Sequence, residues 1–198
     1  MASPSSRPGS EDEPTVALST PAPGTTSLLA PLAIGALVIV TLGAFGRMHD
    51  PAGIAVTVPG FSGTLATKSW LATGGFLLAL GQLFSALVMF GKVPGIAAPS
   101  WIGTVHRWLG RIALVLVIPV AVHCLYAVGF QSFNARTLIH SVVGCFFFGA
   151  FTVKMLVLPR KDVPGWVLPV VGGLVFTGLV VLWLTSSLWF FTTVGIKF

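Results

Sequence analysis

Charged side chains are scarce in this sequence. Only 8% of its 198 residues are charged and 55% are hydrophobic, whereas about a quarter of the residues in a soluble domain carry a charge. The composition therefore excludes an ordinary soluble enzyme and indicates an integral membrane protein. At this length the chain has room for one membrane domain with short loops.

Acidic residues are the scarcest charged type. The five of them are Glu11, Asp12, Glu13, Asp50 and Asp162, and all lie outside the long apolar segments. A proton-driven transporter normally carries a carboxylate in its membrane path, so this distribution argues against proton coupling. It also leaves the histidines of the apolar segments without the acidic member of a Ser-His-Asp triad.

Several other familiar sites are missing. The sequence has no glycine-rich phosphate loop, dinucleotide-binding fingerprint or zinc-ligand spacing. Its two cysteines, Cys124 and Cys145, lie in apolar segments without a C-x-x-C spacing, which favours buried, unreactive thiols. The net charge of +6 comes from basic residues spread over segment ends, as in membrane anchors rather than in nucleic-acid-binding surfaces.

Long hydrophobic segments are what the sequence has in quantity. Residues 1–27 are rich in Ser, Pro and Thr and predict a disordered amino-terminal tail. Residues 28–198 predict an all-α membrane domain, with five apolar segments close to the ~20 residues that a helix needs to cross a bilayer. We expect these transmembrane helices at about 28–45, 69–90, 104–130, 138–158 and 166–191.

The distribution of basic residues predicts how the helices are oriented. Cytoplasmic loops of membrane proteins are enriched in lysine and arginine. With the amino terminus inside, seven basic residues fall on the inner side: Arg7, Lys92, Arg107, Arg111, Lys154, Arg160 and Lys161. Four fall on the outer side: Arg47, Lys68, Arg136 and Lys197. We therefore expect a multi-pass protein of the cell membrane, N-in and C-out.

Three of the four histidines, His106, His123 and His140, are evenly spaced by seventeen residues in or beside apolar segments. Ionisable side chains inside a membrane are costly and usually functional, and imidazole is a common ligand of haem iron. The alternative is that each histidine donates a hydrogen bond to a backbone carbonyl or a neighbouring helix. The sequence leaves both readings open.

His123 and His140 form the strongest constellation. They flank a short loop, about 10 Å and 5 Å deep at 1.5 Å per residue, so we expect their helices to be antiparallel neighbours. Two imidazoles at similar depth then serve as axial ligands of one haem iron near the outer face. Gly144 lies one turn after His140 and leaves space for a flat macrocycle.

The other two histidines are the alternative iron ligands. His106 lies ~25 Å and about 100° of helix rotation from His123, and no second inner histidine accompanies it. We expect it to be an interfacial anchor beside Arg107 and Arg111, in contact with a quinone or a lipid head group. His49 is expected to be a loop histidine paired with Asp50, or else part of a docking surface for an electron donor.

Six stretches carry a resemblance to a known family. They are PGFSG at 59–63, KSWLAT at 68–73, HRWLG at 106–110, PVAVHC at 119–124, HSVVGC at 140–145 and WLTSSLWFF at 183–191. Through them, residues 47–191 closely resemble an uncharacterised family of small bacterial membrane proteins, a domain of unknown function. More loosely, the histidines of the third and fourth segments look like those of cytochrome b561 and ferric-reductase-type membrane domains.

The looser resemblance implies b-type haem and transmembrane electron transfer. The chain departs from those families in having five apolar spans rather than six and in lacking their four-histidine set. We therefore expect a cytochrome b-like electron-transfer protein with one bis-histidine haem, a subunit of a membrane oxidoreductase. It would pass electrons between a membrane pool such as quinol and an outer redox protein. The alternative is a haem-free accessory or assembly subunit of a larger membrane complex, and a third reading is a small-solute transporter or channel.

Overall fold

The computed structural model describes residues 25–53 and 58–198, which are helical apart from their connecting loops. Five helices are long and apolar enough to cross a membrane, as predicted. They are α1 (Leu29–Met48), α2 (Thr64–Met89), α3 (Ile102–Val122) with the π-helix η2 (His123–Val128), α4 (Ala135–Val157), and α5 (Val167–Trp183) with the π-helix η3 (Leu184–Leu188) and α6 (Trp189–Thr193).

Each of these helices begins and ends within five residues of an apolar segment of the sequence. The largest difference is at α2, which begins at Thr64 rather than at Ser69. The helix continues past Lys68 because a lysine can bury its stem and carry its charge to the surface. The predicted tail lies outside the described residues, except for its last three, which belong to the short 3-10 helix η1 (Thr25–Leu28).

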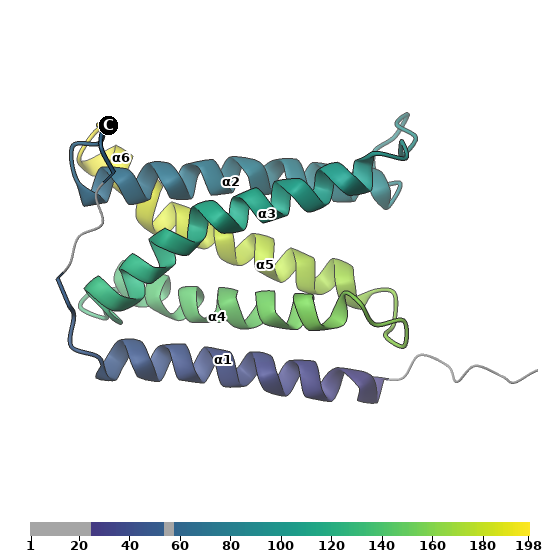
Figure 1. Ribbon diagram of the computed structural model, residues 1–198, viewed down its shortest axis with the longest axis horizontal. Helices are drawn as coiled ribbons and strands as arrows, with labels where there is room; N and C mark the ends of the chain where they lie inside the picture. The colour runs from purple at the N-terminus through teal and green to yellow at the C-terminus, as the bar shows by residue number, and fades with distance from the viewer. Residues whose placement is uncertain (1–24, 54–57) are drawn as a thin grey trace, which may run out of the picture.

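Three helix pairs make the main contacts of the bundle: α3 packs along α2, α1 along α4, and α4 along α5. α3 crosses the bundle obliquely and approaches α4 only near their connecting loop (Figure 1). The expectation that these two helices are packed neighbours is therefore wrong. A short loop joins two helix ends, but the side chains along each helix choose its partner. We call the end of the bundle that holds this loop the α3–α4 end.

Small residues explain why α4 packs on α1. A Cβ on Gly35 would lie 2.9 Å from the carbonyl oxygen of Gly149, and a Cβ on Gly149 would lie 2.7 Å from that of Gly35. Only glycine allows backbones to approach so closely, as is common between membrane helices. The outward side of α1 keeps large apolar residues exposed, with Leu37 and Val40 both at 66%, as a lipid-facing helix requires.

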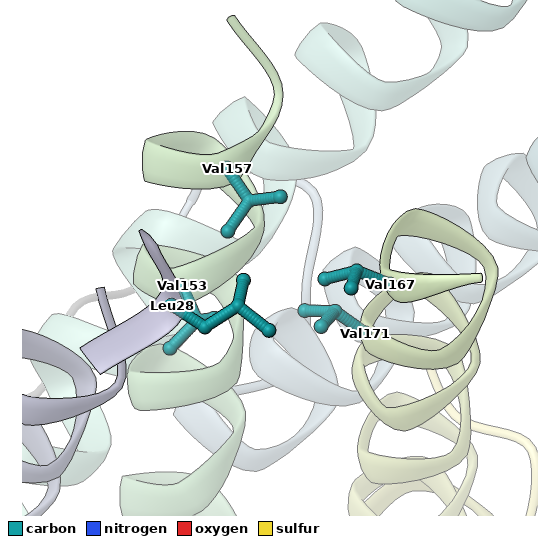
Figure 2. Packing of buried hydrophobic residues seen from close by; sticks show 5 residues of the cluster. All are labelled: Leu28, Val153, Val157, Val167 and Val171. Carbon is teal, nitrogen blue, oxygen red and sulfur yellow. The ribbon is translucent and has the colours of Figure 1, made fainter. Parts of the chain in front are cut away.

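The contact between α4 and α5 holds a compact group of aliphatic side chains. Val153 and Val157 of α4 face Val167 and Val171 of α5, and Leu28 packs beside them (Figure 2). Val157 is fully buried. This cluster fixes the end of the bundle opposite the α3–α4 loop, where α4 leads into α5.

Two π-helical turns lie in the half of the bundle near the α3–α4 end. η2 follows Pro119, which lacks the backbone N–H of a regular helix, and η3 interrupts the continuation of α5. A π turn widens the helix and re-aims the side chains that follow it, and such turns are frequent at functional sites. η2 contains His123 and η3 contains Thr185.

Candidate functional site

A cavity of about 670 Å³ lies in the α3–α4 half of the bundle. All five membrane-spanning helices contribute to its wall, as does the α3–α4 loop. Residues of both α3 and α4 line it, and these two helices diverge from their connecting loop (Figure 1). Most of the wall is apolar, and its polar side chains include Lys68, Arg136, His140, Thr185 and Ser186. An apolar space with a few convergent polar groups is the usual form of a ligand site.

His140 is the histidine that lines this cavity. Its Nδ1 lies 2.9 Å from the Thr185 hydroxyl, and that hydroxyl donates to the Val181 carbonyl at 2.7 Å. A hydroxyl has one hydrogen to donate, so while it donates to the Val181 carbonyl its oxygen is able to accept from His140 Nδ1–H. This arrangement favours the Nδ1–H tautomer, in which Nε2 keeps its lone pair. Neutral imidazole in this state is able to bind a metal or accept a hydrogen bond.

Thr185 also holds a second residue of the cavity wall. Its backbone carbonyl accepts a hydrogen bond of 2.7 Å from Nη1 of Arg136. The Arg136 guanidinium carbon lies 3.9 Å from the centroid of the Trp189 ring, within cation-π distance. One residue of the π-helix η3 therefore orients both His140 and Arg136.

Gly144 completes the face of α4 that lines the cavity. Arg136, His140 and Gly144 are spaced four residues apart, lie on one side of the helix, and all line the cavity. A Cβ on Gly144 would meet only Leu182, at an ordinary 3.8 Å. The glycine thus keeps open a strip of cavity wall that a larger side chain would fill.

His123 lies beside a different space. It is 8% exposed, and its Nδ1 is buried without a hydrogen-bond partner in the described structure. The small cleft next to it is lined by Thr67, Lys68, Leu71, Pro119 and Val120. Lys68 also borders the large cavity. His123 and His140 thus border two neighbouring spaces, whose walls share Lys68 and Val120, rather than one cavity.

His106 packs between α2 and α3. Its Nδ1 lies 2.9 Å from the Ser85 hydroxyl and 3.1 Å from the Gln82 carbonyl, and its own carbonyl accepts from the Gln82 side-chain amide at 3.3 Å. Gly110 faces the same Gln82 side chain. His106 is thus hydrogen-bonded to a neighbouring helix, which is the alternative to iron ligation that the sequence leaves open for each histidine.

His49 is enclosed by aromatic rings. Its ring centroid lies 4.8 Å from that of Phe45 and 4.4 Å from that of Tyr126. Its Nε2 is buried and finds no partner among the residues described, and the expected pairing with Asp50 does not occur among them. His49 therefore joins the end of α1 to η2 through ring packing.

Sequence reasoning missed three residues of the cavity: Lys68, Arg136 and Thr185. From the sequence the two basic residues are expected to be membrane anchors, because a position near a helix end is typical of an anchor and of a cavity-lining cation alike. Thr185 stands in Thr-Ser-Ser inside a long apolar run, and this polar interruption was the available signal. Within the described ranges, no three His, Cys, Asp or Glu side chains gather as a metal-binding group, although haem iron needs only one or two protein ligands.

Comparison with known proteins gives one result. No curated protein and no solved structure matches the chain, so nothing in the comparisons supports the resemblance to cytochrome b561. A family model, described as a family of unknown function, matches residues 28–198. That range includes all five membrane-spanning helices and every residue of the cavity wall. The chain therefore belongs to the family of unknown function DUF6529.

Proposed function

We propose that the protein is a membrane electron-transfer protein that holds one b-type haem in the large cavity, with His140 as an axial ligand. The observation that carries the proposal is that His140 lines the cavity while a hydroxyl lies at its Nδ1. Thr185 lies at hydrogen-bond distance from Nδ1, and its bond to the Val181 carbonyl favours the tautomer with the lone pair on Nε2. Metal-binding histidines commonly donate their other ring N–H in this way.

The cavity suits such a group in size and in chemistry. Its volume of about 670 Å³ falls within the roughly 300–1,000 Å³ of small-molecule and cofactor sites. Its wall is mainly apolar, Gly144 leaves a strip of it open, and Lys68 and Arg136 offer positive charge for acidic substituents. Haem bound there supplies one-electron redox chemistry.

The protein's own residues would set the conditions for that chemistry. Thr185 orients the imidazole, and the mainly apolar wall limits its contact with water. Both influence the reduction potential of a bound haem. The N-in orientation predicted from the basic residues places the cavity toward the outer face. From there it would exchange electrons with a quinone of the membrane and with a redox protein outside.

His123 is the proposed second ligand in the bis-histidine form of the site. Its buried Nδ1 without a described partner supports an imidazole whose bonding is incomplete in the protein alone. Because the side chain borders the small cleft and not the large cavity, the bis-histidine form requires it to reach into the cavity. The proposal of a haem site therefore depends on His140, and His123 is a separate question.

Absorption spectra of the purified protein test the proposal. Protein from haem-replete cells should show a Soret band that shifts on reduction. His140→Ala should abolish it, and His106→Ala, which removes a histidine of the α2–α3 contact, should leave it unchanged. If His123 is the second ligand, His123→Ala should convert a low-spin spectrum to a high-spin one.

The opposite results are equally specific. A wild-type protein without a Soret band, or a band that survives His140→Ala, would disprove the site. A colourless protein that purifies with a stoichiometric partner would support the accessory-subunit alternative.

A further inference from the structure

Two basic side chains, Lys68 and Arg136, border the large cavity. Asp50 and Asp162, the acidic residues of the described part of the chain, do not line it. The Lys68 ammonium makes no hydrogen bond or ion pair within residues 25–53 and 58–198. A positive charge beside apolar surface is costly unless it is paired. The described wall of the cavity thus contains no acidic side chain to neutralise Lys68 and Arg136.

Arg136 is held at the cavity with most of its donors unused. One guanidinium nitrogen donates to the Thr185 carbonyl, and the plane lies over Trp189. A guanidinium has five N–H donors, so four remain after the bond to Thr185. Because the Trp189 ring stacks on the face of the guanidinium, it does not occupy the N–H edges. This forked edge matches a carboxylate, which it binds through two parallel hydrogen bonds.

The positions of Lys68 and Arg136 indicate where the charged and the apolar parts of a bound ligand would lie. Arg136 is the second residue of α4 and Lys68 is the fifth of α2, so both lie near the membrane surface at the α3–α4 end. His140 and Gly144 follow Arg136 toward the middle of the membrane on the same wall. An anionic head would therefore lie at this end and an apolar body would extend inward.

We infer that Lys68 and Arg136 form a carboxylate-binding site, which takes an amphiphile whose acidic head they pair and whose apolar body fills the cavity. Two sources share this chemistry, the propionates of haem and the head group of a fatty acid. The inference uses the cavity of the proposed haem site, and it rests on that proposal only for haem as a source. Each cation should favour the acid over its neutral ester by about tenfold or more, as expected for a hydrogen bond to a charged group.

The test uses the full chain in nanodiscs and two pairs of probes. Haemin is compared with its dimethyl ester, and brominated palmitate with its methyl ester, with affinity measured by quenching of tryptophan fluorescence. Trp183 and Trp189 line the cavity and serve as reporters. Wild-type protein should bind at least one acid about tenfold or more tighter than its ester, and Lys68→Gln and Arg136→Gln should each reduce this ratio.

Matched variants keep the result specific. Arg136→Lys preserves the charge without the fork and should keep part of the ratio, which also guards against a misfolded Arg136→Gln. Lys92→Gln removes an exposed lysine outside the cavity and should leave the ratio intact. Preference for palmitate without binding of haemin supports the carboxylate site while the haem proposal fails. Equal affinity for acids and esters, a ratio unchanged in the double variant, or no binding of any probe would overturn the inference.

Discussion

His140 and His106 have nearly the same first contact and very different surroundings. Each ring places Nδ1 2.9 Å from a hydroxyl on a neighbouring helix, Thr185 for His140 and Ser85 for His106. His140 lies where α4 diverges from α3 and faces a cavity, whereas His106 lies where α3 packs along α2. A hydroxyl partner therefore does not distinguish a ligand from a packing residue. The two residues differ in that His140 lines the large cavity and His106 does not.

Adding side-chain volume beside His140 and beside His106 should give the largest difference between the two regions. Gly144→Phe places a ring in the space beside His140, and we expect the proposed haem to be lost while the bundle stays folded. Gly110→Ala, at the His106 contact, would press on the Gln82 side chain, so we expect a stability loss of about 1–3 kcal/mol with haem retained. Absorption spectra and thermal unfolding in nanodiscs measure both effects. Equal haem loss in the two variants would contradict the assignment.

Removing the hydroxyl partner of His140 should have an intermediate effect. Thr185→Val keeps the shape of the side chain but removes the acceptor of Nδ1–H, and such changes beside a metal ligand cost about 10–100-fold in affinity. Thr185→Ser restores the hydroxyl and should restore affinity. Haem titration of the apoprotein gives the ratio. An unchanged affinity in Thr185→Val would show that the tautomer is not held by this bond.

The matching change at His106 should have the smallest effect. Ser85→Ala removes the hydroxyl next to Nδ1, but the Gln82 carbonyl remains 3.1 Å away as an acceptor. We expect a loss of about 1 kcal/mol or less in the free energy of unfolding and no change in the visible spectrum. Thermal unfolding of the full chain provides the measurement. A spectral change would place His106 in the redox site after all.

The five spans could be predicted because bilayer thickness fixes how long an apolar helix must be. The face shared by His140 and Gly144 followed from the helical period. The divergence of α3 and α4 could not be predicted, because it depends on the approach of Gly35 to Gly149, two residues more than a hundred positions apart. The contact of Thr185 with His140 could not be predicted either, because a π turn shifts side chains away from the regular α-helical period.

The oblique path of α3 has one more consequence. α2 and α3 form one pair and α1, α4 and α5 another group, and α2 is linked to α5 by the stacked rings of Phe76 and Trp183 at 4.7 Å. A molecule in the cavity would contact both sets of helices at once and hold them together. Because such a ligand binds only the assembled bundle, its presence should raise the unfolding temperature with concentration. The empty and filled proteins would then differ in mechanical stiffness as well as in chemistry.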